Sequence, residues 1–248
     1  MNYFKSIPAA FKIYRCMNIF LKNAPEIEKA WKEKDHEQAL KIINDGENTF
    51  CDNIEKKLSL SLDIIGNENI PESTSGPFLI VANHQGYADI FAILDAFRNR
   101  PISFIAKSEF KKFKPLAKSI YYTGSLFIKR GSPRDAVYTL KDATERFHNG
   151  YTLAIFPEGT RSHSTEMNHF KPGSFKFAIK AGVPILPITL LNTYKIFEEN
   201  NSFESLPIKM VIHPLFHIEK MNRSDQKNAH LQIEKIIRDG LEKYKIEN

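Results

Sequence analysis

The sequence has few cysteines and no long apolar run. Cys16 and Cys51 are its only cysteines in 248 residues, too few for a disulfide framework, and neither lies in a CxxC pattern. No stretch approaches the roughly 18 apolar residues of a membrane-spanning helix. Lys5, Lys12 and Arg15 interrupt the N-terminal apolar residues, which is unlike a signal peptide. These features favour a protein of a reducing compartment without a membrane span.

The motifs of several common enzyme classes are also missing. None of the 11 glycines has a second glycine two positions later, so there is no GxGxxG, and the P-loop, GxSxG and HExxH are absent too. His163, His169, His213 and His217 lack companions at metal-ligand spacing, and Pro214 interrupts any helix that would join the last two. The sequence therefore argues against a dehydrogenase, a nucleotide kinase, a serine hydrolase and a zinc hydrolase, and we expect no metal site.

The charge is mildly basic. Lysine and arginine number 35 against 29 aspartates and glutamates, which gives a formal net charge of +6 and a pI near 9.1. This balance suits a phosphate-bearing partner and leaves nucleic acid, an anionic membrane and a phosphorylated small substrate open. Nucleic acid ranks last, because no stripe of basic and aromatic residues typical of such modules is present.

From about residue 60 onward, short apolar runs alternate with helical patterns. Helices are expected at 133–149, with Ser132 as N-cap and Pro133 in the first helical position, and at 224–244. This alternation predicts an α/β fold: a single domain with a mostly parallel or mixed central sheet flanked by helices and preceded by an N-terminal helical segment. The expected strands are 60–65, 78–82, 102–106, 125–128, 152–156, 185–190 and 208–212.

The first 59 residues are helical in character. In residues 1–22, Phe4, Ile7, Phe11, Tyr14 and Met17 share one helical face beside basic residues. A short amphipathic helix of this kind lies in a membrane interface or packs on the domain by the same face. Residues 25–58 are predicted to form a charged helical hairpin with a break at 44–46. We therefore divide the chain into an N-terminal helical, membrane-association segment, 1–59, and a main domain, 60–248.

A histidine and an aspartate follow the expected strand 78–82. His84 lies in a polar turn, and Asp89 falls in the first turn of the next helix. Catalytic groups collect just past the carboxyl ends of strands in open α/β sheets, and here the carboxylate can fold back onto the imidazole. Such a carboxylate fixes the tautomer and leaves the other ring nitrogen as a general base. The alternative is a satisfied histidine at a strand end, with Asp89 as an ordinary helix-start residue.

Charged side chains follow three more expected strands. Glu158 and Arg161 stand in the turn after 152–156, where Gly159 lets the backbone turn or approach a ligand. The planar fork of Arg161 suits a phosphate or a carboxylate. Lys107 ends one strand and Arg130 follows another, so we expect a cationic pocket at the sheet edge that carries His84. The alternatives are an ion pair between Arg161 and Glu158 and a solvated basic rim.

Four segments in this order resemble the sequence blocks of the glycerolipid acyltransferase family, which includes the 1-acylglycerol-3-phosphate acyltransferases. The segments are NHQGYAD at 83–89, GSLFIKR at 124–130, FPEGTRS at 156–162 and VPILPI at 183–188. The resemblance covers roughly residues 60–217 and makes 60–248 the acyltransferase domain. The chain departs from the family at Gln85–Tyr87, where small residues are frequent, and at Lys129, where many members are acidic. Both departures bear on acceptor selectivity.

The resemblance implies that His84 deprotonates the acceptor hydroxyl, which then attacks an acyl thioester, and that Asp89 orients His84. It implies neither a covalent acyl-enzyme nor a cofactor, because acyl-CoA or acyl carrier protein serves as co-substrate. The basic residues of the site would bind the acceptor phosphate, and the others would shape the acceptor site or the acyl tunnel. The substrate-binding residues implied are Lys107, Arg130, Glu158, Gly159, Thr160, Arg161, Pro184 and Ile185.

The implied reaction transfers a fatty acyl group to the sn-2 hydroxyl of 1-acyl-glycerol 3-phosphate and gives phosphatidic acid for phospholipid synthesis. The expected partners are lysophosphatidic acid, the thioester donor and an anionic membrane surface, which predicts a peripheral membrane enzyme on the cytoplasmic face. Two alternatives stay open. One is a family member that acylates glycerol 3-phosphate or another lysolipid, and the other is a catalytically silent lipid-binding membrane module.

Overall fold

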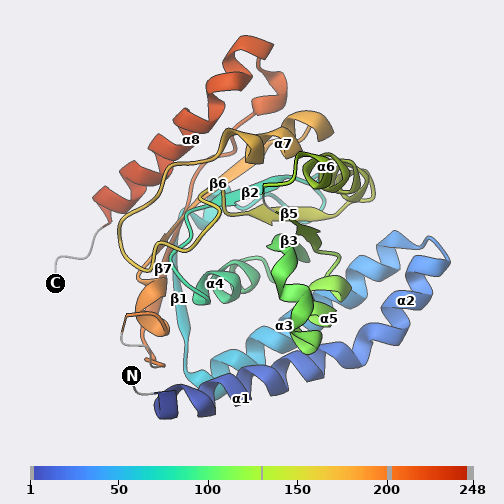
Figure 1. Ribbon diagram of the computed structural model, residues 1–248, viewed down its shortest axis with the longest axis vertical. Helices are drawn as coiled ribbons and strands as arrows, with labels where there is room; N and C mark the ends of the chain where they lie inside the picture. Colours follow the sequence, from blue (N-terminus) through green and yellow to red (C-terminus); the bar gives the residue numbers. More distant parts are fainter. Residues whose placement is uncertain (1–2, 130, 200–202, 245–248) are drawn as a thin grey trace.

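A seven-stranded mixed sheet forms the centre of the computed structural model, which describes residues 3–129, 131–199 and 203–244, with side chains from residue 8 onward (Figure 1). Its strands are β1 (Ser61–Ile65), β2 (Leu79–Ala82), β3 (Ile102–Lys107), β4 (Leu126–Ile128), β5 (Thr152–Ile155), β6 (Ile185–Leu191) and β7 (Pro207–Ile212). They lie in the order β1-β7-β6-β2-β5-β3-β4. All neighbours are parallel except β6 and β7.

The sequence pattern located these elements well. Every expected strand is present with bounds within one residue of the prediction, and so are α6 (Pro133–His148) and α8 (Arg223–Lys243). Ser132 caps α6 by accepting a hydrogen bond from the backbone N–H of Asp135 at 3.2 Å. The predicted α/β fold with a mixed central sheet flanked by helices is confirmed.

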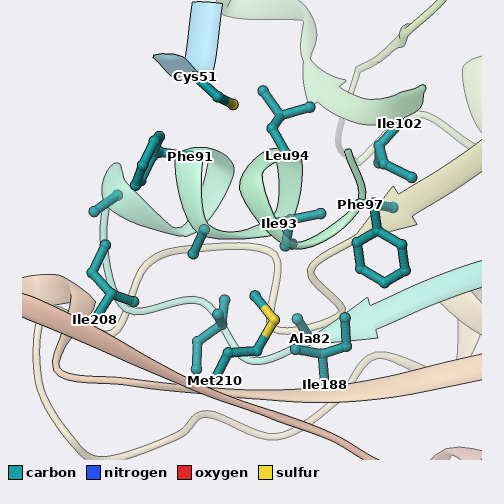
Figure 2. Packing of buried hydrophobic residues seen from close by; sticks show 14 of the residues in the cluster. Cys51, Ala82, Phe91, Ile93, Leu94, Phe97, Ile102, Ile188, Ile208 and Met210 are labelled. Atoms are coloured by element: carbon teal, nitrogen blue, oxygen red, sulfur yellow. The ribbon is translucent and has the colours of Figure 1, made fainter. Parts of the chain in front are cut away.

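Helices cover both faces of the sheet, and β2 shows how its residues divide between them. Phe78, Ile80 and Ala82 belong to a cluster with α3 (His36–Leu58) and α4 (Ala88–Ala96). Leu79 and Val81 belong to the other buried cluster, with residues of α6, α7 (Lys176–Ala181) and α8. Figure 1 shows these three helices on the opposite side of the sheet from α3 and α4. This alternation is the period of a strand buried on both sides. Figure 2 shows α4 lying on the sheet, with the Cys51 side chain of α3 above it.

The N-terminal helices are α1 (Tyr3–Phe20), α2 (Ala24–Lys32) and α3. The predicted break at 44–46 is wrong, because α3 runs through these residues and the turn lies at 33–35. Lys34 has a φ of 60°, and the Asp35 side chain caps α3 by accepting from the backbone N–H of Gln38 at 2.9 Å. Gly46 allows close packing within this segment, because a Cβ at position 46 would stand 2.7 Å from atoms of both Phe20 and Asn23.

One face of α1 packs inside the protein and another faces outward. Helix α1 contacts α3 and α5 (Lys114–Tyr122), and it buries Ala9, Cys16 and Phe20. Phe11 and Tyr14, which belong to the predicted apolar face, are 59% and 46% exposed. That face is therefore not the one by which α1 packs on the domain. The side chains of Phe4 and Ile7 lie outside the described part of the chain.

The N-terminal helices share a core with the rest of the chain. Cys51, Ile54 and Leu58 of α3 belong to the same buried cluster as Ile80 of β2. On α2, the Trp31 indole N–H donates to the Tyr151 hydroxyl at 2.8 Å, just before β5. The helical segment is thus packed against the sheet domain rather than standing apart from it.

Candidate active site

The polar residues singled out in the sequence follow strands that end at one edge of the sheet. Strands β2, β5, β3 and β4 are parallel neighbours, so their carboxyl ends point the same way. His84 follows β2, the turn with Glu158 and Arg161 follows β5, and Lys107 is the last residue of β3. The structure therefore brings these groups to a common edge, as expected. Arg130 lies outside the described residues.

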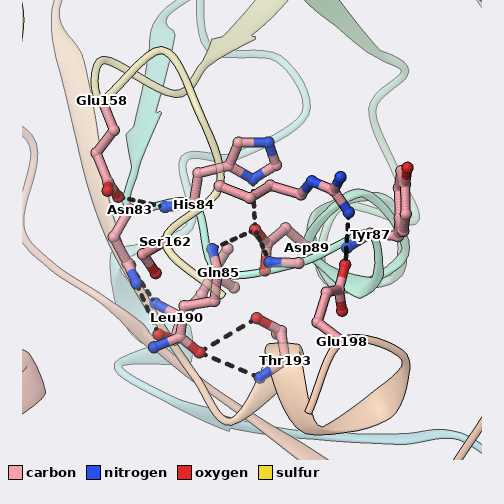
Figure 3. Close-up of polar contacts among 12 residues, drawn as sticks. Asn83, His84, Gln85, Tyr87, Asp89, Glu158, Ser162, Leu190, Thr193 and Glu198 are labelled. Atoms are coloured by element: carbon pink, nitrogen blue, oxygen red, sulfur yellow. Dashed lines mark hydrogen bonds and ion pairs between the residues drawn. The ribbon is translucent and has the colours of Figure 1, made fainter. Parts of the chain in front are cut away.

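The imidazole of His84 is held by the carboxylate of Asp89. His84 Nδ1 and Asp89 Oδ2 are 2.6 Å apart (Figure 3). The contact forms because Asp89 sits in the first turn of α4 and points back over the turn that carries His84. The same oxygen accepts the backbone N–H groups of Gln85 at 2.8 Å and Gly86 at 3.0 Å. The predicted pairing of histidine and aspartate is present, with Asp89 fully buried.

The other side of the ring is accessible. The His84 side chain is 18% exposed, and the ring stacks on Phe156, with centroids 4.0 Å apart and planes 13° apart. Among the residues that the structure describes, His84 Nε2 makes no hydrogen bond. A carboxylate on Nδ1 favours the tautomer with its proton there, which leaves Nε2 as the acceptor nitrogen. The geometry thus provides a fixed base with its acceptor nitrogen free.

Glu158 is buried and supports the histidine turn. One carboxylate oxygen accepts the backbone N–H of His84 at 2.6 Å, and the other accepts the backbone and side-chain N–H groups of Asn168 at 2.8 and 2.9 Å. Burial raises the pKa of Glu158, while the hydrogen bonds from His84 and Asn168 lower it. Because both oxygens already have protein partners, the contacts seen here hold the loops together. The predicted role of Glu158 in shaping the acceptor site stays a prediction.

Arg161 pairs with Glu198 rather than with Glu158. Arg161 Nη1 donates to Glu198 Oε1 at 2.8 Å, and the guanidinium carbon lies 3.8 Å from the centroid of the Tyr87 ring. The alternative of an Arg161–Glu158 ion pair is therefore wrong. The β5 turn is also joined to the histidine turn by the backbone, since the N–H of Ser162 donates to the carbonyl of His84 at 2.8 Å.

Strand β6 supports the site from the other side of β2. The Asn83 side-chain amide pairs with the backbone of Leu190, donating at 2.9 Å and accepting at 2.7 Å (Figure 3). Gln85 Oε1 accepts from the backbone N–H and the hydroxyl of Thr193 at 3.2 and 3.3 Å. Both amides are buried. They fix the turn that carries His84 to the end of β6.

Two predicted substrate-binding residues lie elsewhere. Ile185 is the first residue of β6 and pairs with Leu79, the first residue of β2, whereas His84 follows the opposite end of β2. At about 3.3 Å per residue, that separation is about 16 Å. Ile185 is also fully buried, and the carbonyl of Pro184 accepts from Leu79. Pro184 and Ile185 therefore do not lie beside His84, and their role in lining the acceptor site or the acyl tunnel stays a prediction. It is the far end of β6, at Leu190, that approaches the histidine turn.

The remaining substrate-binding candidates stay near the edge. Gly159 is buried and has a φ of 76°, a backbone conformation that glycine adopts freely. Lys171 Nζ lies 2.5 Å from the point where a Cβ of residue 159 would stand, which adds a cation beside this turn. Thr160 is exposed, and Lys107 is half-buried.

Comparison with known proteins gives the family. A model of the acyltransferase family matches residues 61–191. The chain belongs to the acyltransferase family. It is 32% identical over 181 residues to the 1-acyl-sn-glycerol-3-phosphate acyltransferase of Borreliella burgdorferi, covering 73% of this chain and 70% of that one. It is 35% identical over 152 residues to a 1-acyl-sn-glycerol-3-phosphate acyltransferase of Chlamydomonas reinhardtii, covering 60% of this chain and 45% of the algal one.

A solved structure supports the same assignment for this acyltransferase. The crystal structure of the 1-acyl-sn-glycerophosphate (LPA) acyltransferase PlsC from Thermotoga maritima superposes with a TM-score of 0.74 at 25% identity. The match covers 100% of this chain and 99% of that one, so the N-terminal helices are included.

Sequence reasoning missed Glu198. It lies outside the four blocks, follows β6 by several residues, and is one of two adjacent glutamates that look like a solvated charged turn. Nothing in its local sequence marks it. Only the fold brings it to Arg161 and to the histidine turn.

Proposed function

We propose that this acyltransferase moves a fatty acyl group from a thioester donor, acyl-CoA or acyl carrier protein, to the sn-2 hydroxyl of 1-acyl-glycerol 3-phosphate and so forms phosphatidic acid. The observation that carries the proposal is the short His84–Asp89 contact at a sheet edge with His84 Nε2 on the accessible side. The names of the relatives from Borreliella burgdorferi and Thermotoga maritima support the choice of acceptor.

The proposed chemistry follows from the two ring nitrogens. Nε2 takes the proton of the acceptor hydroxyl as its oxygen attacks the thioester carbonyl. Asp89 stabilises the imidazolium through Nδ1. The tetrahedral intermediate collapses, the carbon–sulfur bond breaks, and the imidazolium returns the proton to the leaving thiolate. No serine or cysteine side chain among the described residues hydrogen-bonds to Nε2, which favours direct transfer over an acyl-enzyme.

Arg161 is the proposed anchor for the acceptor phosphate. Its guanidinium has five N–H donors, and one is directed to Glu198. The others leave room for charge-assisted contacts with phosphate oxygens. We assign Lys107, Arg130 and Thr160 to the same anion site and Glu158 and Gly159 to the support of its wall. No cofactor takes part beyond the acyl donor.

The test crosses donors with acceptors. Palmitoyl-CoA and palmitoyl-acyl carrier protein are each supplied with 1-acyl-glycerol 3-phosphate, with glycerol 3-phosphate, or with no acceptor, and thiol release is followed together with the lipid product. The proposal expects release that depends on 1-acyl-glycerol 3-phosphate and yields phosphatidic acid. Release with glycerol 3-phosphate alone would assign the other acceptor. No release with any pair would favour a silent lipid-binding module.

We also propose that the protein docks on the cytoplasmic face of an anionic membrane through its N-terminal segment, 1–59, and α5. Within the described ranges, no helix has the length and apolar character to cross a bilayer. Phe11 and Tyr14 of α1 are exposed, and so are Phe113 and Tyr121 at the two ends of α5, which packs beside α1. Lysines and arginines accompany these aromatic residues, as in interfacial helices.

The docking proposal is tested by co-sedimentation with phosphatidylglycerol vesicles. The double variant Phe11→Ala/Tyr14→Ala removes two exposed rings without touching the core, and binding is expected to weaken by about tenfold. The control is Tyr138→Ala on α6. Tyr138 is 54% exposed, and its ring lies beneath Arg134 as the Phe11 ring lies beneath Arg15. Equal binding by the double variant and wild type would remove α1 from the docking surface.

A further inference from the structure

Glu198 is a buried carboxylate that the proposed chemistry does not use. Its side chain is only 4% exposed. It stands just beyond the short helix Thr193–Ile196, which is anchored by the fully buried Ile196. The backbone N–H of Glu198 donates to the carbonyl of Tyr194 at 2.8 Å. Figure 3 shows the side chain reaching from this segment toward the turn with Tyr87. The short helix and this backbone hydrogen bond thus hold the Glu198 carboxylate in place at the site.

One oxygen of Glu198 joins the two halves of the site. Oε1 accepts the backbone N–H of Tyr87 at 2.8 Å and Arg161 Nη1 at 2.8 Å. Tyr87 lies in the turn between β2 and α4, next to the His84–Asp89 pair, whereas Arg161 lies in the turn after β5. A single carboxylate oxygen thus links the guanidinium to the histidine turn, in addition to the stacking of Arg161 on the Tyr87 ring.

The fit around this carboxylate is tight. A Cβ on Gly86 would stand 2.5 Å from Glu198 Oε2, so only glycine leaves space at position 86. Oε2 itself is buried and has no hydrogen-bond partner among the described residues. Burial raises the pKa of Glu198, the hydrogen bonds from Tyr87 and Arg161 lower it, and the nearby charge of Asp89 raises it further.

Two roles are conceivable for such a contact, and the geometry separates them. A carboxylate that competes with the acceptor phosphate would have to release Arg161, which would leave a buried charge without its ion-pair partner. Glu198 is also fixed by Tyr87 and cannot follow the arginine. A carboxylate that positions Arg161, in contrast, accepts from one of its five guanidinium donors and leaves the others for the ligand. Stacking on the Tyr87 ring further restricts the guanidinium.

We propose that Glu198 is a positioning residue for the acceptor: it fixes the Arg161 guanidinium relative to the histidine turn, so that a bound glycerol-phosphate monoester presents its hydroxyl to His84. The inference rests on the proposed function in taking the acceptor phosphate as the ligand of Arg161. It adds a specificity-determining contact from a segment outside the four sequence blocks.

The test measures binding rather than turnover. Isothermal titration with 1-hexanoyl-glycerol 3-phosphate, a short-chain soluble acceptor, gives the Kd of wild type, Glu198→Ala, Glu198→Gln and Glu199→Ala. Glu198→Ala is expected to raise the Kd about tenfold or more, because the arginine loses a charge-assisted partner. Glu198→Gln keeps one acceptor oxygen and should recover most of the affinity. Glu199, the exposed neighbour, is the matched control and should change nothing.

A double variant separates positioning from general damage to the fold. If Glu198 acts through Arg161, Arg161→Ala weakens binding and Glu198→Ala/Arg161→Ala weakens it no further. The KM for the acyl donor stays unchanged in Glu198→Ala. Three results would each overturn the inference. The first is that the losses of affinity in the two single variants add in the double variant. The others are that the KM for the acyl donor rises as much as the Kd for the acceptor, or that Glu198→Ala binds the acceptor as well as or better than wild type.

The outcomes distinguish this inference from the proposed function. If wild type releases no thiol but its affinity for the soluble acceptor falls in Glu198→Ala, the proposed reaction fails and the positioning role stands. If wild type acylates 1-acyl-glycerol 3-phosphate and Glu198→Ala binds normally, only the positioning role fails. If wild type does not bind the soluble acceptor, the positioning role is overturned as well.

Discussion

At the scale of single residues, one oxygen of Asp89 organises the histidine turn. Oδ2 faces three donors, the His84 ring and the backbone N–H groups of Gln85 and Gly86, at 2.6 to 3.0 Å. Oδ1 is buried and has no hydrogen-bond partner within the described ranges. A charged acceptor in this position both orients the ring and stabilises its protonated form during transfer. The negative charge of Asp89 therefore contributes to catalysis beyond the hydrogen bonds that an uncharged side chain of the same shape could accept.

Asp89→Asn tests this point. An amide cannot stabilise the imidazolium as a carboxylate does. Its NH2 group would take the place either of Oδ2, opposite three donors, or of the buried Oδ1. We expect kcat to fall on the order of 10²–10⁴-fold, with little change in the Kd of the soluble acceptor. The exposed Asp239→Asn on α8 is the control. A kcat within a factor of about three of wild type in Asp89→Asn would contradict an orienting role.

At the scale of elements, Gly46 decides how closely the N-terminal helices approach each other. Helix propensity alone predicts that alanine stabilises an interior glycine position by about 1 kcal/mol. Here a Cβ would overlap Phe20 and Asn23 at 2.7 Å, at the contact where the chain leaving α1 meets α3. At this position, the change in helix propensity and the change in packing therefore have opposite effects on the free energy of unfolding.

We expect Gly46→Ala to lower the free energy of unfolding by about 1–3 kcal/mol, because overpacking outweighs the gain in propensity. Thermal unfolding followed by circular dichroism measures it. Asp45→Ala, at an exposed neighbour in the same helix, serves as the control and should be close to neutral. A variant at Gly46 as stable as wild type would mean that the side chains of Phe20 and Asn23 move aside at little cost, which would contradict the expected overpacking.

The helical hairpin shows where sequence patterns stop being informative about elements. The strands were located because short apolar runs bounded by polar turns are typical of strands buried in a sheet. Gly46 suggested a break in the helix. The structure instead requires glycine there because Phe20 and Asn23, more than twenty positions earlier, pack against it. The real turn, at Lys34 and Asp35, lies in a charged stretch without glycine or proline.

The site divides in the same way. His84 and Asp89 could be paired from the sequence because they are five positions apart, and a strand end and a helix start fix their geometry. Arg161 could be placed at the same edge through the parallel strands. Its partner Glu198 could not, because it lies 37 positions further along the chain with a strand of the sheet between them. The sequence also did not show that Pro184 and Ile185 stand at the end of β6 remote from His84, because that depends on the register between β6 and β2.

At the scale of the whole molecule, α8 closes one face of the sheet near a half-buried histidine. The Thr189 hydroxyl contacts His213 Nε2 at 2.8 Å, and a Cβ on Gly240 would stand 2.5 Å from that hydroxyl oxygen. Burial lowers the pKa of His213 from 6.5 to about 4. The folded protein thus keeps this imidazole neutral in conditions where an unfolded chain would protonate it.

This difference makes stability depend on pH. The contribution of His213 is intact above about pH 6.5 and is lost as the pH falls from about 6.5 to about 4, because the unfolded state binds the proton first. The loss is at most about 3 kcal/mol. His213→Gln removes this titration, so its melting temperature should fall less than that of wild type over the same window. The exposed His148→Gln is the control, and identical pH profiles for wild type and His213→Gln would refute the assignment.

The proposed acyl transfer depends on His84 as its base, and the most direct measurement is the turnover of His84→Ala. With palmitoyl-CoA or palmitoyl-acyl carrier protein as donor and 1-acyl-glycerol 3-phosphate as acceptor, we predict a loss in kcat on the order of 10²–10⁴-fold. The melting temperature and the Kd for the soluble acceptor should stay close to wild type. A folded His84→Ala variant that retains more than about a tenth of wild-type turnover would contradict the account.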